Sequence, residues 1–448
     1  MWEPEFGRER YMKQIGVGLI GFGTVGAGVV EALQRNGAVL AERTGVLPVL
    51  RGIADIDIER DRGVKVDPAL LTRDALSVIR NPEVRIVVEL VGGTTIAKTF
   101  ILEALRLGKT VITANKALLA EQGAEILAAS AASGADVWFE ASVAGGIPII
   151  RVLRDGLVAN RITALYGILN GTCNYILTRM EREQMTFDHA LKEAQAAGYA
   201  EADPGLDIDG YDTAHKAAIL ASLAYGVRVP MERVFVEGIR GLAKVDIEHA
   251  RSLGYRVKLL AVIKNERGVV DIRVHPTLVP VEHMLASVMG VFNAVVVDGD
   301  VVGQTVYYGR GAGRMPTASA VVSDIAEASR TLAVENRVAR PAPYRGGELA
   351  YLDIGDVISR YYLRLSLADK PGVLGVVATE LGRNNISLAS VLQKEPHTSG
   401  RAVPVVVLTH PARERDVTTA LRALEEMQAI GTKSVRLRIE DLGIEKNA

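Results

Sequence analysis

The sequence of 448 residues has little of what marks several classes of protein. Its single cysteine, Cys173, excludes an internal disulfide and fits a reducing compartment such as the cytoplasm. No run of 18 apolar residues occurs, so we expect no transmembrane span, and the polar residues 1–11 lack the apolar core of a signal peptide. The formal net charge of −1 gives no electrostatic reason to expect nucleic acid or a membrane surface as a partner.

What the sequence does contain is an ordinary globular composition with abundant glycine. Hydrophobic residues make up 48% and charged residues 23% of the chain, which is typical of a globular protein. The length predicts about three domains. Of the 44 glycines, several gather in short segments where the backbone would need to come close to a ligand.

The first glycine-rich segment is Gly21-Phe22-Gly23-Thr24-Val25-Gly26. It follows a strand expected at Ile15–Ile20 and opens a helix expected to run to about Gln34, which is the context of a dinucleotide-binding motif. The first glycine permits a tight turn, the second lets the backbone approach a pyrophosphate, and the third lets the helix pack on the strand. We therefore expect a Rossmann-type doubly wound domain that binds NAD or NADP, with the phosphates at the helix N-terminus.

The choice between the two nucleotides depends on the end of the next strand, expected at Leu47–Ala54. Asp55 at that point could hold the adenine ribose, which favours NAD, whereas Arg51 nearby could accept a 2′-phosphate, which favours NADP. The spacing from Gly26 is longer than usual, so both assignments remain open.

Further cofactor contacts are expected where later strands of the same sheet end, because parallel sheets bind ligands at their carboxyl edge. These strands are expected at 85–90, 109–113 and 136–141. A glycine-rich segment at 309–314 opens another helix, expected from Pro316 to about Ser329, and could return the chain to the cofactor. The residues assigned to the cofactor on these grounds are Thr94, Thr95, Lys116 and Gly313.

A middle region alternates strands and helices and predicts an α+β domain. Its strands are expected at 162–169, 257–264, 271–276 and 294–299. Its helices are expected at 149–156, 172–183, 186–197, 211–225 and 281–287.

The segment Gly198–Lys216, GYAEADPGLDIDGYDTAHK, is the most informative part of the chain. It concentrates one Glu, four Asp, one His and one Lys before an apolar helix. Asp212 and Lys216 lie four residues apart, on one face of that helix, so an acid that can hold an ammonium stands beside a lysine that can transfer a proton. The simpler alternative is that Asp209 caps the helix and that Asp212 and Lys216 form a solvated ion pair.

The C-terminal region has the order of a ferredoxin-like βαββαβ unit. Its elements are expected at 359–367, 373–383, 386–393, 403–410, 412–427 and 432–440, after a Pro- and Gly-rich linker. The sequence thus predicts four parts: a dinucleotide-binding domain at 1–141, a catalytic and oligomerisation domain at 142–335, the linker at 336–348 and the ferredoxin-like unit at 349–448. Residues 305–335 are expected to pack back on the first domain.

Five segments resemble the homoserine dehydrogenase family: GFGTVG at 21–26, TANKALLA at 113–120, FEASVAGGIPI at 139–149, LNGTCNYIL at 169–177 and the segment 198–216. The C-terminal unit, with DKPGVL at 369–374 and NNISL at 384–388, resembles an ACT regulatory domain, which the long form of this family carries. The resemblance implies NAD(P)-dependent interconversion of L-homoserine and L-aspartate 4-semialdehyde, in the biosynthesis of threonine, methionine and isoleucine.

The resemblance also implies roles for particular residues. Lys216 would be the proton relay, and Lys116 would hold the reacting oxygen and the nicotinamide. The residues implied to bind substrate are Gly198, Glu201, Asp207 and Asp212, of which Gly198 would also contact the cofactor. The residues implied to hold a structural sodium ion, through one carboxylate and three backbone carbonyls, are Glu140, Val143, Gly145 and Ile147. The alternative at this loop is a tight turn with a capping glutamate.

Regulation is expected in the ACT-like unit. Threonine would be the feedback inhibitor, bound at Gly372 and at Asn384 or Asn385 within a homo-oligomer, a dimer or a tetramer. Two asparagines after a helix are also a common helix stop. Deleting residues from about 348 onward is expected to leave activity and abolish threonine sensitivity.

Two other functions fit part of this pattern. One is an NAD(P) oxidoreductase that acts on a different amino-acid semialdehyde, although no cysteine stands where a thioester route would need a nucleophile. The other is a non-catalytic sensor that couples a nucleotide-binding domain to the ACT-like unit, which the presence of both lysines and the carboxylates disfavours.

Overall fold

The computed structural model describes residues 13–334, 344, 347–393, 402–427 and 433–442. Residues 1–12 and most of the predicted linker lie outside this range. The chain divides into two compact units, each described separately below. Unit 1 takes the described residues of Met1–Ile162, His215–Glu232 and Asn293–Glu348, and unit 2 takes those of Thr163–Ala214, Arg233–Phe292 and Leu349–Ala448.

Unit 1 is built on a six-stranded parallel sheet in the order β3-β2-β1-β4-β5-β6. The strands are β1 (Lys13–Ile20), β2 (Val46–Ala54), β3 (Leu71–Thr72), β4 (Val84–Glu89), β5 (Thr110–Thr113) and β6 (Val137–Trp138). Helices cover both faces, so the central strands β1 and β4 are buried along most of their length and do not alternate regularly between buried and exposed residues. This order confirms the predicted doubly wound dinucleotide-binding fold.

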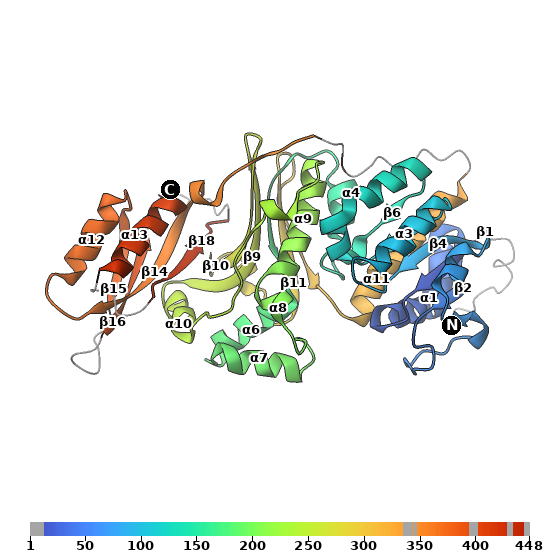
Figure 1. Cartoon of the computed structure of the whole chain (residues 1–448), viewed down its shortest axis with the longest axis horizontal. Helices are drawn as coiled ribbons and strands as arrows, with labels where there is room; N and C mark the ends of the chain where they lie inside the picture. Colours follow the sequence, from blue (N-terminus) through green and yellow to red (C-terminus); the bar gives the residue numbers. More distant parts are fainter. Residues whose placement is uncertain (1–12, 335–343, 345–346, 394–401, 428–432, 443–448) are drawn as a thin grey trace. The chain divides into compact units, whose positions relative to one another are not determined.

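Two groups of helices sandwich this sheet (Figure 1). α1 (Thr24–Thr44) and α11 (Arg314–Ala333) pack side by side and bury Val17 and Leu19 of β1. The other face is covered by α2 (Ala75–Arg80), α3 (Ile96–Arg106) and α4 (Lys116–Ser133). Gly28 of α1 makes the contact with α11 close, because a Cβ there would lie 2.8 Å from the Arg314 carbonyl oxygen.

The remainder of unit 1 holds short elements around the end of β6. They are the 3₁₀ turn η3 (Glu140–Ser142), α5 (Ile149–Arg151), the π-helical turn η4 (Val152–Gly156) and the paired strands β11 (Phe292–Gly299) and β12 (Gly303–Arg310). α9 (Tyr211–Tyr225) begins in unit 2 and continues into unit 1. In unit 1 it meets α4, where His215 Nε2 lies 3.5 Å from Glu121 Oε1.

Unit 2 contains a sheet in the order β7-β9-β10-β18-β14-β16-β15. Its first part comprises β7 (Ile162–Ile168), the antiparallel hairpin β9 (Tyr255–Glu266) and β10 (Val269–Pro280), and the short β8 (Phe235–Val236). Its helices are α6 (Gly171–Arg182), α7 (Phe187–Ala196), α8 (Gly205–Ile208) and α10 (Lys244–Ser252). The helix expected at 281–287 is only a 3₁₀ turn, Met284–Ser287, because β10 continues through Pro280.

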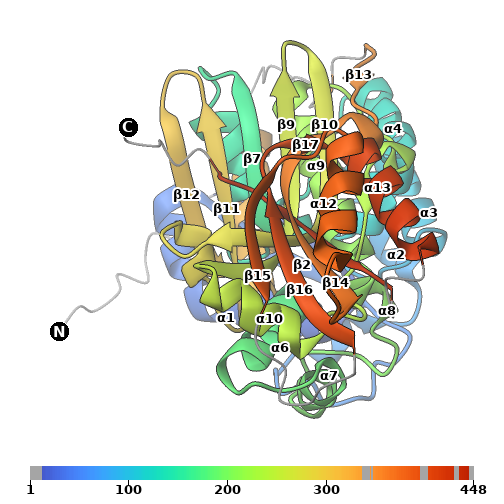
Figure 2. The same ribbon diagram turned by 90° about the vertical axis from the view of Figure 1, so that its left-hand side faces the viewer.

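The C-terminal part of unit 2 is the βαββαβ unit expected from the sequence (Figure 2). Its elements are β14 (Ile358–Ala368), α12 (Val373–Arg383), β15 (Leu388–Gln393), β16 (Ala402–Thr409), α13 (Glu414–Glu426) and β18 (Val435–Ile439), with short strands β13 (Ala350–Tyr351) and β17 (Ala412–Arg413). Both helices pack on one face of the strands around a core that includes Leu363, Val377 and Leu421. The ferredoxin-like prediction is therefore confirmed.

Buried charges line the join between this C-terminal part and β10. β18 pairs in parallel with β10 at Thr277 and Leu278. Arg273 of β10, only 2% exposed, donates to Asp271 at 2.9 Å and to Glu440 at 2.8 Å. Desolvation opposes the charge on Glu440, but Arg273 and Lys264 keep its pKa below the ordinary value. Among the described residues, no helix is both long and apolar enough to cross a membrane.

Candidate active site

The glycine loop between β1 and α1 has the shape that a pyrophosphate requires. Gly21 adopts a left-handed φ of 98°, and a Cβ there would lie 2.7 Å from the Leu90 carbonyl carbon. A Cβ on Gly26 would lie 2.2 Å from the Gly21 carbonyl oxygen, so the helix start fits closely against the loop. Gly23 caps α1 without a side-chain hydrogen bond and has open space where a Cβ would be. The first turn of α1, which has no acidic residue, is therefore suited to bind an anion.

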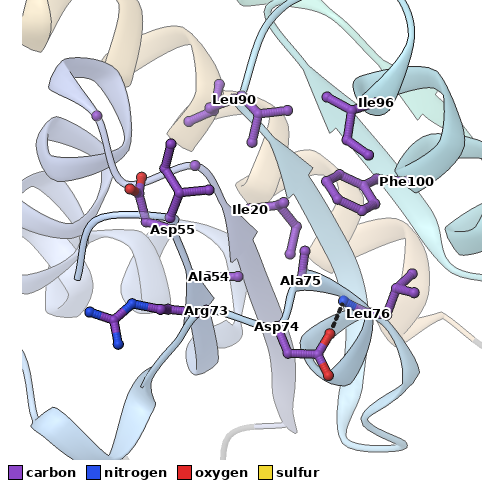
Figure 3. A pocket seen from close by; sticks show the side chains of 14 residues that line it. Ile20, Ala54, Asp55, Arg73, Asp74, Ala75, Leu76, Leu90, Ile96 and Phe100 are labelled. Carbon is purple, nitrogen blue, oxygen red and sulfur yellow. Dashed lines mark hydrogen bonds between the residues drawn. The ribbon is translucent and has the colours of Figure 1, made fainter.

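A pocket of about 590 Å³ opens beside this loop (Figure 3). Its wall is largely apolar, with Ile20, Leu90, Ile96 and Phe100 among the lining side chains, and Asp55, Arg73 and Asp74 supply the charge. A slot of this kind beside a glycine loop fits the adenosine half of a dinucleotide. Arg51 is not among the described lining residues; its guanidinium donates to Gln14 at 3.3 Å.

The loop after β4 is held by polar groups that the sequence did not single out. Glu89, fully buried, accepts hydrogen bonds from the backbone of Val91 at 2.8 Å and from the Thr113 hydroxyl at 2.7 Å. Burial raises the pKa of this carboxyl, although these hydrogen bonds oppose the shift. Asn115 caps α4 and donates to the Gly93 carbonyl at 2.7 Å. The loop is therefore fixed to the start of α4.

The predicted cofactor residues outside the glycine loop lie at element ends of unit 1. Thr94 and Thr95 precede α3, with Thr95 at its N-cap, and Lys116 is the first residue of α4. Gly313 is the N-cap of α11 with a φ of 119°. Each of these positions adjoins a helix N-terminus, where backbone N–H groups are available to an anionic ligand.

In unit 2 a single side-chain amide joins two of the aspartates that are predicted to bind substrate. Asn170 Nδ2 donates to Asp207 Oδ1 at 2.7 Å and to Asp212 Oδ2 at 2.8 Å. Its Oδ1 accepts the Cys173 N–H at 2.8 Å and caps α6, which fixes the side chain. Asn170 belongs to the LNGTCN segment, but no role for it was predicted from the sequence. The signal that could have found it is an N-cap asparagine directly before a helix.

α9 carries the acid and the lysine that the sequence analysis placed on one helical face. Asp212 is 4% and Lys216 9% exposed, so the alternative of a solvated surface pair is wrong. Four residues of helix separate them by about 6 Å along the axis and leave both on one side. Asp209 does not cap α9: it is the C-cap of α8, and its carboxylate pairs with Arg240 at 2.7 Å.

Two other residues of the segment 198–216, and the single cysteine on α6, have different surroundings. Glu201 is exposed, and its backbone carbonyl accepts a hydrogen bond from the side-chain amide of Gln195. Gly198 ends the α7 region with a φ of 73°. Cys173 is fully buried, and its thiol donates to the Asp207 carbonyl at 3.2 Å. The thiol is therefore a packed structural group next to the carboxylates and has no access to solvent.

The predicted cation loop is buried and rich in carboxyl groups. Glu140 accepts the N–H groups of Ile150 at 3.0 Å and Arg151 at 2.9 Å, and its own N–H donates to Asp324 Oδ2 at 2.9 Å. Burial raises the pKa of Glu140 to about 7, and burial together with the nearby Glu140 charge raises that of Asp324 to about 8. Arg151 lies 3.7 Å from Asp324.

This loop therefore has features of both interpretations, a sodium site and a tight turn with a capping glutamate. The hydrogen bonds of Glu140 are those of a capping glutamate. Two buried carboxyl groups close together also make a site where a cation would relieve the unfavourable charge. The residues around it, Val143, Gly145 and Ile147, are buried or nearly so, and their carbonyl oxygens are the hard ligands that sodium takes. Among the described residues, no group of three His, Cys, Asp or Glu side chains forms a metal site.

The predicted effector residues lie at the two ends of α12. Gly372 precedes the helix with a φ of 90°. Asn384 is its C-cap and donates to the Glu380 carbonyl at 2.9 Å, and Asn385 follows with a φ of 58°. This is the geometry of a helix stop, which was the alternative reading of the two asparagines.

Comparison with known proteins gives the family. A model described as homoserine dehydrogenase matches residues 148–326, one described as the homoserine dehydrogenase NAD-binding domain matches 21–140, and one for the ACT domain matches 361–426. Homoserine dehydrogenase of Pseudomonas aeruginosa is 45% identical over 438 residues, which cover 96% of this chain and 100% of that protein. The chain belongs to the homoserine dehydrogenase family.

Solved structures agree with this assignment. A homoserine dehydrogenase from Thiobacillus denitrificans has 43% identity and a TM-score of 0.90, covering 96% of this chain and 99% of that one. A hyperthermophilic archaeal homoserine dehydrogenase in complex with NADPH has 28% identity and a TM-score of 0.62, covering 73% and 100%. The protein is therefore an oxidoreductase with a nicotinamide-dinucleotide-binding domain, a catalytic domain and a C-terminal ACT domain.

Proposed function

We propose that this protein interconverts L-homoserine and L-aspartate 4-semialdehyde, as one step in making threonine, methionine and isoleucine. The observation that carries the proposal is the polar arrangement on α9 and α6. Buried Asp212 and Lys216 share one face of α9, and Asn170 fixes Asp212 beside Asp207. A substrate with an ammonium and a primary alcohol on a short chain matches a carboxylate and a lysine about one helical turn apart.

The carboxylates bind the amino end of the substrate in this proposal. Asp207 and Asp212 are both held by Asn170, and their negative charge would attract an ammonium. Glu201, exposed on its loop, and Gly198, whose positive φ turns the chain, complete the binding segment when substrate is present.

Lys216 handles the proton. When homoserine is oxidised, Lys216 accepts the proton of its hydroxyl group. A bound nicotinamide would supply the acceptor for the hydride that C4 gives up. In the reverse direction the Lys216 ammonium returns that proton to the aldehyde oxygen. Lys116, at the N-terminus of α4, holds the reacting oxygen and the nicotinamide, where the partial positive charge of the helix end assists it.

The cation loop has a structural role in the proposal. A sodium ion held by Glu140 and the carbonyls of Val143, Gly145 and Ile147 would compensate the buried carboxyl groups and fix the turn into α5. Replacing sodium by choline at constant ionic strength is expected to lower the melting temperature of the wild type. An equal melting temperature in both salts would reject the ion.

Regulation and assembly follow from the ACT domain. We propose threonine as the effector, bound near Gly372, Asn384 and Asn385, and a homo-oligomer, dimer or tetramer, in the cytoplasm. The match to the ACT domain supports a small-molecule effector. The single buried cysteine fits a reducing compartment.

The experiment is a steady-state assay with L-aspartate 4-semialdehyde and NADH or NADPH, compared with other amino-acid aldehydes. Turnover is expected with the four-carbon substrate, and it should fall sharply when the ammonium is removed, because the substrate then lacks the charge that Asp207 and Asp212 are proposed to bind. Preferred turnover of a different amino-acid semialdehyde would reject the substrate, and absence of turnover with both nucleotides would favour a sensor.

A further inference from the structure

We propose that the dinucleotide pocket selects NAD(H) over NADP(H), and that Asp55 is the residue that makes this choice. The proposal rests on the nucleotide site of the proposed function but does not depend on which substrate is reduced. Four basic or acidic residues near the end of β2 decide the question: Asp55, Arg62, Arg73 and Arg51.

Asp55 directly follows β2 and is fixed against the glycine loop. Its Oδ2 accepts the Phe22 N–H at 2.6 Å, and its Oδ1 accepts the Asp57 N–H at 2.9 Å. The side chain is 13% exposed and lines the pocket beside Gly21 and Gly23 (Figure 3). The carboxylate thus stands where the adenine ribose lies when the phosphates occupy the N-terminus of α1.

The bonding capacity of this carboxylate favours an unphosphorylated ribose. The two oxygens offer about four acceptor positions, and the protein uses three of them. The position that remains can accept a hydrogen bond from a ribose hydroxyl. A 2′-phosphate has no hydroxyl at this point and brings negative charge against a fixed negative charge, which is unfavourable in a partly buried site.

Arg62, the nearest cation, does not reverse this preference, because its guanidinium already binds other groups of the protein. Arg62 donates through Nη2 to Asp55 at 3.1 Å and through Nη1 to the Arg60 carbonyl at 2.8 Å. It stacks 5.1 Å over the Phe22 ring and is only 9% exposed. Its guanidinium thus holds Asp55 in place and is not among the groups that line the pocket.

Arg73 is the rival residue, because it lines the pocket and could attract a 2′-phosphate. Its side chain is 59% exposed, and its guanidinium pairs with Glu59 at 3.0 Å and points away from the apolar wall in Figure 3. An exposed arginine that is already paired is a weak phosphate site compared with a fixed carboxylate at the ribose. Arg51 lies within β2 and bonds Gln14.

The test is direct binding of NADH and of NADPH to the full-length protein without substrate, followed by nucleotide fluorescence. The wild type is expected to bind NADH at least ten times more tightly than NADPH. Asp55→Asn keeps the size of the side chain and removes its charge, and it should lower that ratio at least tenfold. Arg73→Ala and the matched pocket variant Asp74→Asn, which keeps its helix cap, should change the ratio less than twofold.

Several outcomes would overturn the proposal. They are equal or tighter binding of NADPH by the wild type, an unchanged ratio in Asp55→Asn, a selective loss of NADPH in Arg73→Ala, and an equal effect of Asp74→Asn. The proposed function fails separately: an enzyme that prefers NADH but ignores homoserine refutes only the substrate, and one that oxidises homoserine with NADPH preference refutes only the selection by Asp55.

Discussion

At the scale of single residues, Lys216 has the central chemical role in the proposed reaction. Lys216→Ala removes the group proposed to exchange a proton with the substrate oxygen, so we expect kcat to fall about 10²–10⁴-fold, the usual contribution of a general acid or base. NADH binding should stay within twofold. The matched control is Lys192→Ala on α7, an exposed lysine, which should change neither value. Full turnover by the Lys216 variant would remove this residue from the mechanism.

Asn170 is proposed to position Asp207 and Asp212, the carboxylates that bind the substrate in the proposed function. Asn170→Asp keeps the helix cap but replaces the amide donor by a third negative charge beside Asp207 and Asp212. We expect KM for the amino-acid substrate to rise at least tenfold with NADH affinity unchanged. Asn170→Ser, which also caps, should raise KM less, because it adds no charge. Equal KM values in both variants would show that the residue acts only on α6.

The sequence indicated the proposed catalytic groups better than the groups that hold them in place. Lys216 and Asp212 were singled out because a charged face on an apolar helix is visible in the pattern. Asn170, Glu89 and Asn115 were not, because capping and loop-fixing bonds depend on which segments the fold brings together. Arg51 illustrates the same limit: its nearness in sequence to Asp55 did not indicate that its side chain bonds Gln14.

At the scale of elements, a buried lysine connects β9 to α6. Lys258, 1% exposed, donates to Asn174 Oδ1 at 3.2 Å and to the Val288 carbonyl. Burial lowers its pKa to about 7, against a weaker opposing effect of Glu181. α6 begins at the Asn170 cap, so this bond supports the element that carries the substrate-side amide.

The pH dependence of stability tests this connection. Between about pH 7 and the ordinary lysine pKa of 10.5, the unfolded chain binds more protons than the folded one, so the free energy of unfolding should rise with pH from this group. Lys258→Met should flatten that rise in urea titrations between pH 6.5 and 9. The exposed lysine variant Lys192→Met should keep the wild-type slope. An unchanged slope in Lys258→Met would contradict the assignment.

Element prediction succeeded where the apolar period was long and failed where it was short or mixed. The strands β1, β2, β4 and β14 and the helices α9 and α12 were placed within a few residues. β3 was missed because it has only two residues. α10 was missed because its sequence KVDIEHARS is polar, although Asp246 and His249 are buried against Tyr362 of β14.

At the scale of the whole molecule, the ACT domain is joined to the rest of unit 2 through buried charge. Glu440→Gln removes one of the two carboxylates that bind Arg273, whose side chain is 2% exposed, and breaking such a buried pair costs about 3–5 kcal/mol. Glu248→Gln breaks an exposed helical pair with Lys244 and should cost under about 1 kcal/mol. Chemical denaturation compares the two. A similar cost for both would mean that the buried pair adds nothing to stability.

The same join changes how regulation should be tested. Deleting residues from about 348 would remove Glu440 and β18, expose β10 and take one of the two carboxylate partners of Arg273, so loss of activity would not be informative. Asn385→Gly removes a side chain proposed to hold the effector, and glycine accepts the φ of 58°. We expect the threonine concentration for half inhibition to rise at least tenfold with uninhibited kcat unchanged. Unaltered inhibition would place the effector elsewhere.

The central claim is that a hydride leaves C4 of L-homoserine for a nicotinamide while Lys216 takes the hydroxyl proton. The most direct measurement follows deuterium from L-homoserine labelled at C4, using NMR of the nicotinamide ring after a single turnover. The account predicts one deuterium on the reduced ring and one left on the aldehyde carbon of the product, with no transfer in Lys216→Ala on the same time scale. A reduced nicotinamide ring without deuterium, after homoserine has been consumed, would contradict it.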